Sequence, residues 1–219
     1  MQVSIPEIPM REALHFLGWR GSALEEPILS QIQSAMVEVR KMLTAQVAVR
    51  HFALDENRCL ADTSFAPCGQ DVHAMLETCG GAILMAATLG AQSERLLLRY
   101  QAKSSAEALV MDAVLSAAIE AVCDEQERIL RENYGKDNLH LTDRFSPGYG
   151  DMPLEQTREI CAVLDTQKTI GLTVSHSGIM IPRKSVTAIL GVSDVPQKRR
   201  PSQCAVCSMA KTCSLREFR

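Results

Sequence analysis

The sequence predicts an α+β fold, with a mixed, mainly antiparallel twisted sheet, flanking helices and one long central helix. Residues 104–134 have a long helical pattern, and its middle, ALVMDAVLSAAIEAVC, is nearly apolar all round, which is typical of a helix packed on more than one side. Residues 45–54 alternate and are rich in β-branched side chains, and residues 80–90 form a glycine-bounded apolar run, so both favour strands. Helices and strands alternate irregularly, which fits α+β better than a doubly wound α/β fold.

The long helix has clear end signals: Ser104 or Ser105 suits its N-cap and Gly135 its end. Pro27 suits the first turn of another helix, whose apolar residues recur at helical spacing. The remaining elements are expected as helices over 10–18, 27–44, 69–78, 91–101 and 154–165, and as strands near 139–142, 172–178 and 185–192.

Length and composition limit the classes of protein. A chain of 219 residues predicts one main domain, which we place over 1–194, and a basic, Cys-containing tail over 195–219. The net charge of −3 argues against a general nucleic-acid surface, which needs clustered Lys and Arg. We find neither a signal peptide nor an apolar stretch of about 18 residues, so we expect no membrane association and a cytoplasmic protein with reduced cysteines.

The segment RFSPGYGDMP, residues 144–153, holds more chemistry than a turn requires. Arg144 offers a planar set of donors for a carboxylate or phosphate. Pro147 fixes its own φ, Gly148 lets a ligand approach the backbone, and Tyr149 offers a flat apolar face with a polar tip. The segment therefore suits a small ligand with a carboxylate and a ring. In the alternative, it is a tight turn in which Arg144 pairs with a carboxylate of the chain: Asp143, Asp151 or Glu155.

Two ordered motifs carry a resemblance to a known family. The stretch 144–189 resembles the S-adenosylmethionine-binding activation domain of cobalamin-dependent methionine synthase, and a looser similarity, including LHFLGWRG near the start, extends to about residue 193. That family has an R-P-x-P-G-Y segment, a helix, and then M-x-P-x-x-S-V-[ST]. The matching residues are Arg144, Pro147, Gly148 and Tyr149, followed by Met180, Pro182, Ser185, Val186 and Thr187.

The resemblance implies a function in corrinoid reactivation. In this family a low-potential reductant such as flavodoxin reduces inactive Co(II), and S-adenosylmethionine methylates the resulting Co(I). The cobalt is the nucleophile, so the resemblance implies no catalytic side chain; the protein positions the methyl group. Because the sequence has no D-x-H-x-x-G cobalamin motif, we expect an accessory component, not a complete enzyme. It would act on a partner that carries the cobalamin, either a methionine synthase or another corrinoid methyltransferase.

The resemblance also implies a ligand site. Arg144 would bind the ligand carboxylate, backbone groups of Ser146 and Gly148 would meet its polar ends, and Tyr149 would line the pocket. Leu190 and Gly191 would complete the site, because they stand where the family has aromatic residues that contact the ligand.

The sequence departs from the family pattern at two places. The family has an acidic residue before an aromatic one, where it meets the ligand's amino group, but here the pair is Gly18-Trp19. The aromatic residues after the second motif are replaced by Ala188 to Gly191. These departures favour two alternatives: a redox activator of corrinoid proteins that does not bind S-adenosylmethionine, or a non-catalytic module that docks on a corrinoid protein.

The tail contains a possible metal site. Cys204, Cys207 and Cys213 form a C-x2-C-x5-C array, and the C-x2-C pair places two thiolates on one tight turn, as zinc and iron–sulfur sites need. In the alternative these are three reduced thiols. Cys123 and Cys161 fall in apolar helical patterns and are expected in the core. A fourth metal ligand would come from a second chain or from one of three other cysteines: Cys59, Cys68 or Cys79.

Overall fold

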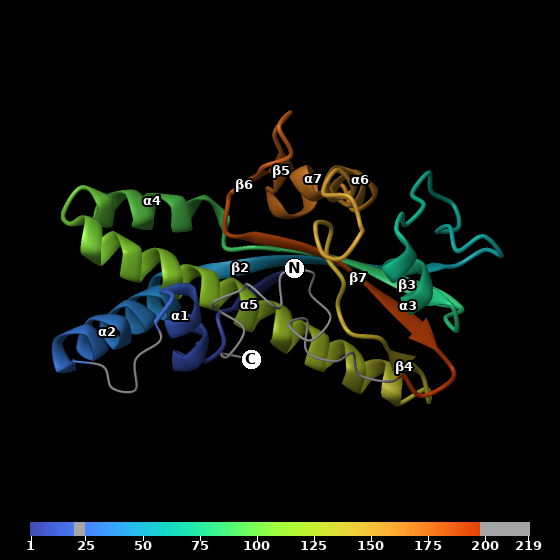
Figure 1. Ribbon diagram of the computed structural model, residues 1–219, viewed down its shortest axis with the longest axis horizontal. Helices are drawn as coiled ribbons and strands as arrows, with labels where there is room; N and C mark the ends of the chain where they lie inside the picture. The colour runs from blue at the N-terminus through green and yellow to red at the C-terminus, as the bar shows by residue number, and fades with distance from the viewer. Residues whose placement is uncertain (20–24, 198–219) are drawn as a thin grey trace.

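The computed structural model describes residues 1–19 and 25–197, and Figure 1 shows their arrangement around a central sheet. The sheet has five strands in the order β1-β2-β3-β7-β4, and each neighbouring pair is antiparallel. The strands are β1 (Gln2–Ser4), β2 (Thr44–Ala53), β3 (Gly81–Thr88), β7 (Ser185–Ser193) and β4 (His140–Leu141).

Helices cover both faces of the sheet (Figure 1). The long helix α5 crosses one face, together with α1 and α2, while α6, α7 and a small hairpin lie over the other. The bounds are α1 (Met10–Phe16), α2 (Glu26–Met42), α3 (Gln70–Leu76), α4 (Gly90–Gln101), α5 (Ser105–Gly135), α6 (Gln156–Val163) and α7 (Thr166–Ile170), with the hairpin strands β5 (Thr173–Val174) and β6 (Met180–Ile181).

The central strands are apolar on both faces because each face meets its own core. In β3, Ile83 and Met85 pack in the core on the α5 side, whereas Ala82 and Leu84 pack in the core on the α6 side. Successive side chains of a strand point to opposite faces, so a strand covered on both sides becomes a continuous apolar run. All eight residues of β3 are buried, which explains why the run over 80–90 lacks the alternation of a half-exposed strand.

Helix α5 has 31 residues, and it packs against α1, α2 and α4 as well as the sheet. The Ser104 side chain caps it by accepting a hydrogen bond from the Glu107 N–H at 3.4 Å. The expected N-cap and the packing on several sides are thus both confirmed. Several of its acidic residues are left outside this packing, and they matter for the candidate site.

The predicted fold class and most predicted elements are confirmed. The sequence did not reveal β1, α7 or β6, which have only three, five and two residues. The strand expected over 172–178 is reduced to Thr173–Val174 because the chain turns back at once to pair with β6. Among the described residues, no helix is long and apolar enough to cross a membrane. The boundary placed after residue 194 stays a prediction.

Candidate functional site

The segment that leads to the candidate site extends the sheet along the edge of β7. The Thr142 N–H donates to the Gly191 carbonyl at 3.0 Å, and Phe145 and Ile189 exchange backbone hydrogen bonds of 2.9 and 2.8 Å. The Phe145 side chain is buried in the core on the α6 side of the sheet. Because side chains alternate along an extended segment, Arg144 points the other way, toward α5.

Arg144 is held by carboxylates of α5. Its Nε donates to Glu127 Oε2 at 2.8 Å, it forms an ion pair with Asp124, and its Nη2 lies 3.6 Å from Glu120 Oε2. The Arg144 side chain is only 16% exposed. Neither sequence interpretation anticipated these partners, since the turn interpretation placed the pairing carboxylate at 143, 151 or 155.

These carboxylates belong to a polar stripe along α5. Asp112, Ser116, Glu120, Asp124 and Glu127 follow one another at intervals of three or four residues, so they share one face of the helix. We call this set the α5 polar stripe. Such spacing within an otherwise apolar helix was visible in the sequence, and it is the signal that could have identified these residues.

The second motif, residues 180–187, also contacts the α5 polar stripe. Lys184, just before Ser185, donates from Nζ to Ser116 Oγ at 2.7 Å and forms a 2.9 Å ion pair with Asp112 Oδ1. Ser116 is followed one helical turn later by Glu120, the first carboxylate that approaches Arg144. The two motif segments, about 40 residues apart in sequence, therefore rest on neighbouring turns of one helix.

The ion pairs extend from Arg144 to a second arginine. The Glu127 carboxylate also accepts from Arg131 Nη2 at 2.6 Å, and Arg131 Nη2 lies 3.1 Å from Asp143 Oδ1. Arg131 further donates to the carbonyl groups of Leu141 and Thr142 at 2.6 and 2.8 Å. This arrangement ties the backbone before Arg144 to α5.

The electrostatics keep Arg144 charged. Burial acts to lower the pKa of Arg144, but Cys123 and the carboxylates of Glu120, Asp124 and Glu127 outweigh it and leave the pKa above its usual value. Burial raises the pKa of the neighbouring Cys123 thiol to about 12, although Arg144 acts to lower it. Cys123 is therefore a neutral thiol near pH 7 and acts on Arg144 only at high pH, so near pH 7 the carboxylates balance the arginine's charge.

The turn after Arg144 is tightly hydrogen-bonded. Gly148 has a φ of +90° and donates its N–H to the Met152 carbonyl at 2.9 Å, while the Ser146 carbonyl accepts from the Tyr149 N–H at 3.1 Å. A positive φ of this size favours glycine. Tyr149, which lies in this turn, is 46% exposed. Both backbone positions expected at the ligand thus already take part in the turn, and their role toward a ligand stays a prediction.

Asp151 anchors the turn to α3. Its carboxylate accepts from the backbone N–H groups of Gln70 and Asp71 at 2.6 and 3.1 Å. The hydrogen bond from the Asp71 N–H, together with that from Gln70, lowers the pKa of Asp151. Asp151, which the turn interpretation offered as a partner of Arg144, instead supplies the N-terminal hydrogen bonds of α3.

Leu190 and Gly191 lie within the sheet. Leu190 is fully buried in the core on the α5 side. A Cβ atom on Gly191 would lie 3.0 Å from side-chain atoms of both Leu76 and Thr142, so glycine fits the packing against α3 there. Packing therefore explains both residues, and their predicted ligand contacts are untested.

The other sequence departure lies at the end of α1. Gly18 has a φ of +68° and donates its N–H to the His15 carbonyl at 2.9 Å, and the Trp19 N–H donates to the Leu14 carbonyl at 3.0 Å. Gly18 thus has the left-handed conformation that commonly ends helices.

The cysteines divide between core and surface. Cys123 and Cys161 are buried, as predicted, and so is Cys79, while Cys59 is half-buried and Cys68 is exposed. Within residues 1–19 and 25–197, no three His, Cys, Asp or Glu side chains are grouped as a metal site would need. The predicted ligands lie outside the described residues, and the site stays a prediction: Cys204, Cys207 and Cys213.

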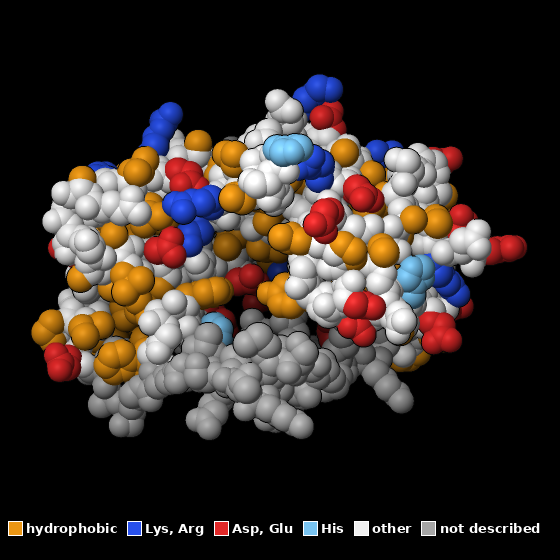
Figure 2. Space-filling view, turned by 45° about the horizontal axis from the view of Figure 1, so that its top comes forward, with side chains coloured by type: hydrophobic (Ala, Val, Ile, Leu, Met, Phe, Trp, Pro, Cys, Tyr) orange, Lys and Arg blue, Asp and Glu red, His pale blue; other side chains and the backbone are white. Residues whose placement is uncertain are grey.

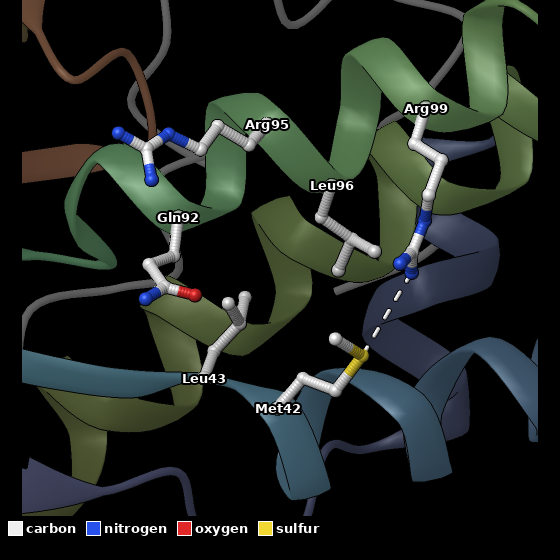
Figure 3. Close-up of a pocket in the computed structure, with 6 residues that line it drawn as sticks. All are labelled: Met42, Leu43, Gln92, Arg95, Leu96 and Arg99. Atoms are coloured by element: carbon white, nitrogen blue, oxygen red, sulfur yellow. Dashed lines mark hydrogen bonds between the residues drawn. The ribbon is translucent and has the colours of Figure 1, made fainter.

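Two surface pockets lie outside the candidate site. One, of about 220 Å³ (Figure 3), is smaller than typical small-molecule pockets of roughly 300–1,000 Å³. It lies between α2 and α4, and its lining residues are Met42, Leu43, Gln92, Arg95, Leu96 and Arg99.

The other pocket has a volume of about 550 Å³ and lies beside the segment before Arg144. On the face of the molecule shown in Figure 2, basic and acidic side chains are interspersed. The second pocket is lined by Ala74, Met75, Glu77, Thr78, Thr142, Asp143, Val195, Pro196 and Gln197.

The antiparallel sheet and the long helix across it form an α+β fold that is also found in a reactivation domain of known structure. One solved structure that shares this fold is the crystal structure of the MetH reactivation domain bound to AdoHcy (S-adenosylhomocysteine). The similarity covers 100% of this chain and 87% of that chain, with a TM-score of 0.63 and 16% sequence identity. No known family model matches the sequence, and no curated protein matches it either. The resemblance seen in the motifs is thus confirmed for the fold.

Proposed function

We propose that the protein binds S-adenosylmethionine at Arg144 and the following turn, and supports reductive methylation of a Co(II) corrinoid on a separate protein. The observation that carries this proposal is the position of Arg144: a nearly buried, charged guanidinium among carboxylates, at the start of the segment that matches the family motif. The shared fold with a domain whose structure contains AdoHcy supports it.

The charged groups suit the amino-acid end of the ligand. A guanidinium binds a carboxylate through two parallel hydrogen bonds, and carboxylates accept hydrogen bonds from an ammonium group. Asp124 is 67% exposed although it pairs with Arg144, so it can exchange this pairing for water or for a ligand. We expect the ligand carboxylate to replace Asp124 at Arg144, and the ligand ammonium to bind the displaced carboxylate. This arrangement would compensate for the missing acid at Gly18.

The reaction proposed on the partner protein needs an electron donor. One electron from a low-potential reductant, such as a flavodoxin, converts Co(II) to Co(I), and Co(I) takes the methyl group from the sulfonium, leaving S-adenosylhomocysteine. The residues of this chain hold the donor and orient its methyl group, and orientation alone accelerates a transfer between bound groups. We expect the reaction to occur in the cytoplasm.

A corrinoid partner would need a surface beside the bound ligand. Tyr149 and Leu154 on the turn, and Ile179 and Ile181 on the β5–β6 hairpin, are about half-exposed apolar side chains. Exposed apolar side chains that lie together are typical of interaction sites. We therefore expect the corrinoid module to dock over the turn and the hairpin.

Calorimetric titration with S-adenosylmethionine tests the proposal. The parent protein should bind it, and Arg144→Gln should reduce the affinity by roughly a hundredfold, since charged hydrogen bonds contribute about 1.5–3 kcal/mol each. Arg128→Gln is the matched control, because Arg128 lies on α5 but pairs with Glu125 and Glu132. Equal affinities of the two variants would contradict the assignment of Arg144. No binding by the parent would favour a redox activator or a docking module.

A further inference from the structure

We infer that the groove between α2 and α4 binds an acidic segment of a partner protein, which inserts one apolar side chain into the pocket of about 220 Å³ shown in Figure 3. None of the residues that line this pocket belongs to the candidate ligand site. The inference therefore does not depend on the ligand proposed for Arg144, and its test can succeed or fail independently.

The pocket has an apolar floor and a polar rim. Leu43 and Leu96 are buried core residues, and Met42 beside them is half-exposed. In Figure 3, Gln92, Leu96 and Arg99 point from α4 toward α2, and Nη2 of Arg99 lies 3.8 Å from Sδ of Met42. The volume is below the range of small-molecule sites, roughly 300–1,000 Å³, so a single apolar side chain of a protein fits the pocket better.

Exposed apolar side chains continue the surface around the groove. Val37 on α2 and Leu98 on α4 are both exposed. Figure 2 shows hydrophobic side chains gathered at the left end of the view, where α2, α4 and the start of α5 lie. Large apolar side chains exposed together are typical of surfaces that contact other proteins. Met and Arg are enriched in such interfaces, and both line this pocket.

Basic side chains follow the α4 side of the groove. Arg95 and Arg99 are four residues apart on α4, so they share one face of the helix, and Lys103 follows four residues later, just after the helix ends. Arg99 is already paired with Glu38 on α2. In the part of the chain that the structure describes, Arg95 has no ion pair or hydrogen bond, and Figure 3 shows its guanidinium pointing away from Met42.

The charge of the pocket favours an acidic partner. The chain has a net charge of −3, yet the described residues that line this pocket include two arginines and no carboxylate. Opposite charges on two surfaces speed their association and exclude partners of the wrong charge. A carboxylate beside the inserted apolar side chain would meet Arg95 first, because this guanidinium has no other pairing to give up.

Fluorescence polarisation with labelled synthetic peptides tests the inference on the full-length protein. The main probe is a short peptide of Glu and Asp residues with one central Leu. One matched probe has Ser in place of Leu, and the other has Lys in place of the acids. The variants are Arg95→Glu and its control Arg40→Glu. Arg40 is an exposed cation of α2 that does not line the pocket, and it stands two positions before Met42, so it faces another way.

We expect the acidic Leu peptide to bind the parent saturably, and at least about tenfold more tightly than either matched probe, because burial of Leu and opposite charge both contribute. Arg95→Glu should weaken this binding by roughly tenfold, and added salt should weaken binding to the parent. Arg40→Glu should keep the parent affinity. Tm values of both variants equal to that of the parent would show that the fold is retained.

No binding of the acidic Leu peptide, equal binding of the three peptides, or equal losses for the two variants would overturn the inference. Displacement of the peptide by butyrate would show that the pocket takes a small carboxylate. A dimer that Arg95→Glu dissociates, seen by analytical ultracentrifugation, would show that a second copy of this chain covers the groove. Both results contradict the proposed partner, and neither bears on S-adenosylmethionine binding at Arg144.

Discussion

The carboxylate of Glu127 accepts a 2.8 Å hydrogen bond from Nε of Arg144, and this bond joins the long helix to the segment that precedes the candidate ligand turn. The same carboxylate accepts from Arg131, which in turn binds the carbonyl groups of Leu141 and Thr142. Glu127 therefore fixes both the direction of Arg144 and the path of the backbone leading to it.

Replacing Glu127 by Gln should destabilise the protein. Both arginines would lose a charged acceptor in a partly buried setting, so we expect a loss of about 1–3 kcal/mol in the free energy of unfolding, measured by urea denaturation. Glu132→Gln is the control, since Glu132 forms an exposed pair with Arg128 and should cost less than about 1 kcal/mol. Equal losses for the two variants would contradict the anchoring role.

The stability contributed by Asp151 should depend on pH. Its pKa is lowered in the folded protein by the hydrogen bonds from Asp71 and Gln70, so its contribution is present above the unfolded pKa of about 3.9. The contribution is lost as pH falls below that value through the folded pKa.

Asp151→Asn should therefore lower Tm at pH 6, and the gap to the parent should narrow as the pH falls below about 4. Thermal unfolding followed by circular dichroism measures both. Asp165→Asn, at an exposed pair with Lys168, is the comparison. A gap for Asp151→Asn that stays constant from pH 6 to pH 3 would show that charge plays no part in holding the turn on α3.

Gly150 should not tolerate a side chain. It has a φ of +53°, and a Cβ atom there would clash with the Asp71 carboxylate and lie 3.3 Å from the Phe145 ring. We expect Gly150→Ala to destabilise the protein by more than about 1 kcal/mol. Gly80→Ala is the control, because nothing lies within 4 Å of a Cβ atom at Gly80. Similar urea midpoints for the two variants would contradict the tight fit of the turn.

The tail cysteines give a prediction that is independent of the fold. Protein purified without oxygen should contain zinc or iron, and Cys204→Ser should reduce that content at least severalfold, because a structural site needs its full ligand set. Cys161→Ser, at a buried thiol that is not a candidate ligand, is the control. Elemental analysis that finds no metal in the parent, even after anaerobic incubation with iron and sulfide, would show that the array is three free thiols.

The sequence predicted the helices and strands whose residue patterns extend over many positions. The apolar face of α2, the continuous apolar run of β3 and the capped length of α5 each gave a signal over many residues. Elements of two to five residues, such as β6 and α7, are too short to show a period and depend on tertiary contacts for their existence. This is why the sequence revealed the layers but not the small hairpin.

The site was predictable only in part. The sequence identified Arg144 as a charged group beside a turn, but the partners that hold it come from a helix about 20 residues earlier. Pairing across that distance depends on how α5 crosses the sheet, which no local pattern specifies. The spacing of Glu120, Asp124 and Glu127 indicated that they share one face of a helix, but it did not indicate that they pair with Arg144. Likewise, burial of Leu190 follows from the sheet register.

The most direct test of the central claim is a crystal structure of the protein grown with S-adenosylhomocysteine. We predict that the ligand carboxylate lies within hydrogen-bond distance of the Arg144 guanidinium, that Asp124 has turned toward the ligand ammonium, and that the adenosine lies along residues 146–149. A ligand bound elsewhere, with Arg144 still paired to Asp124 and Glu127, would contradict the account.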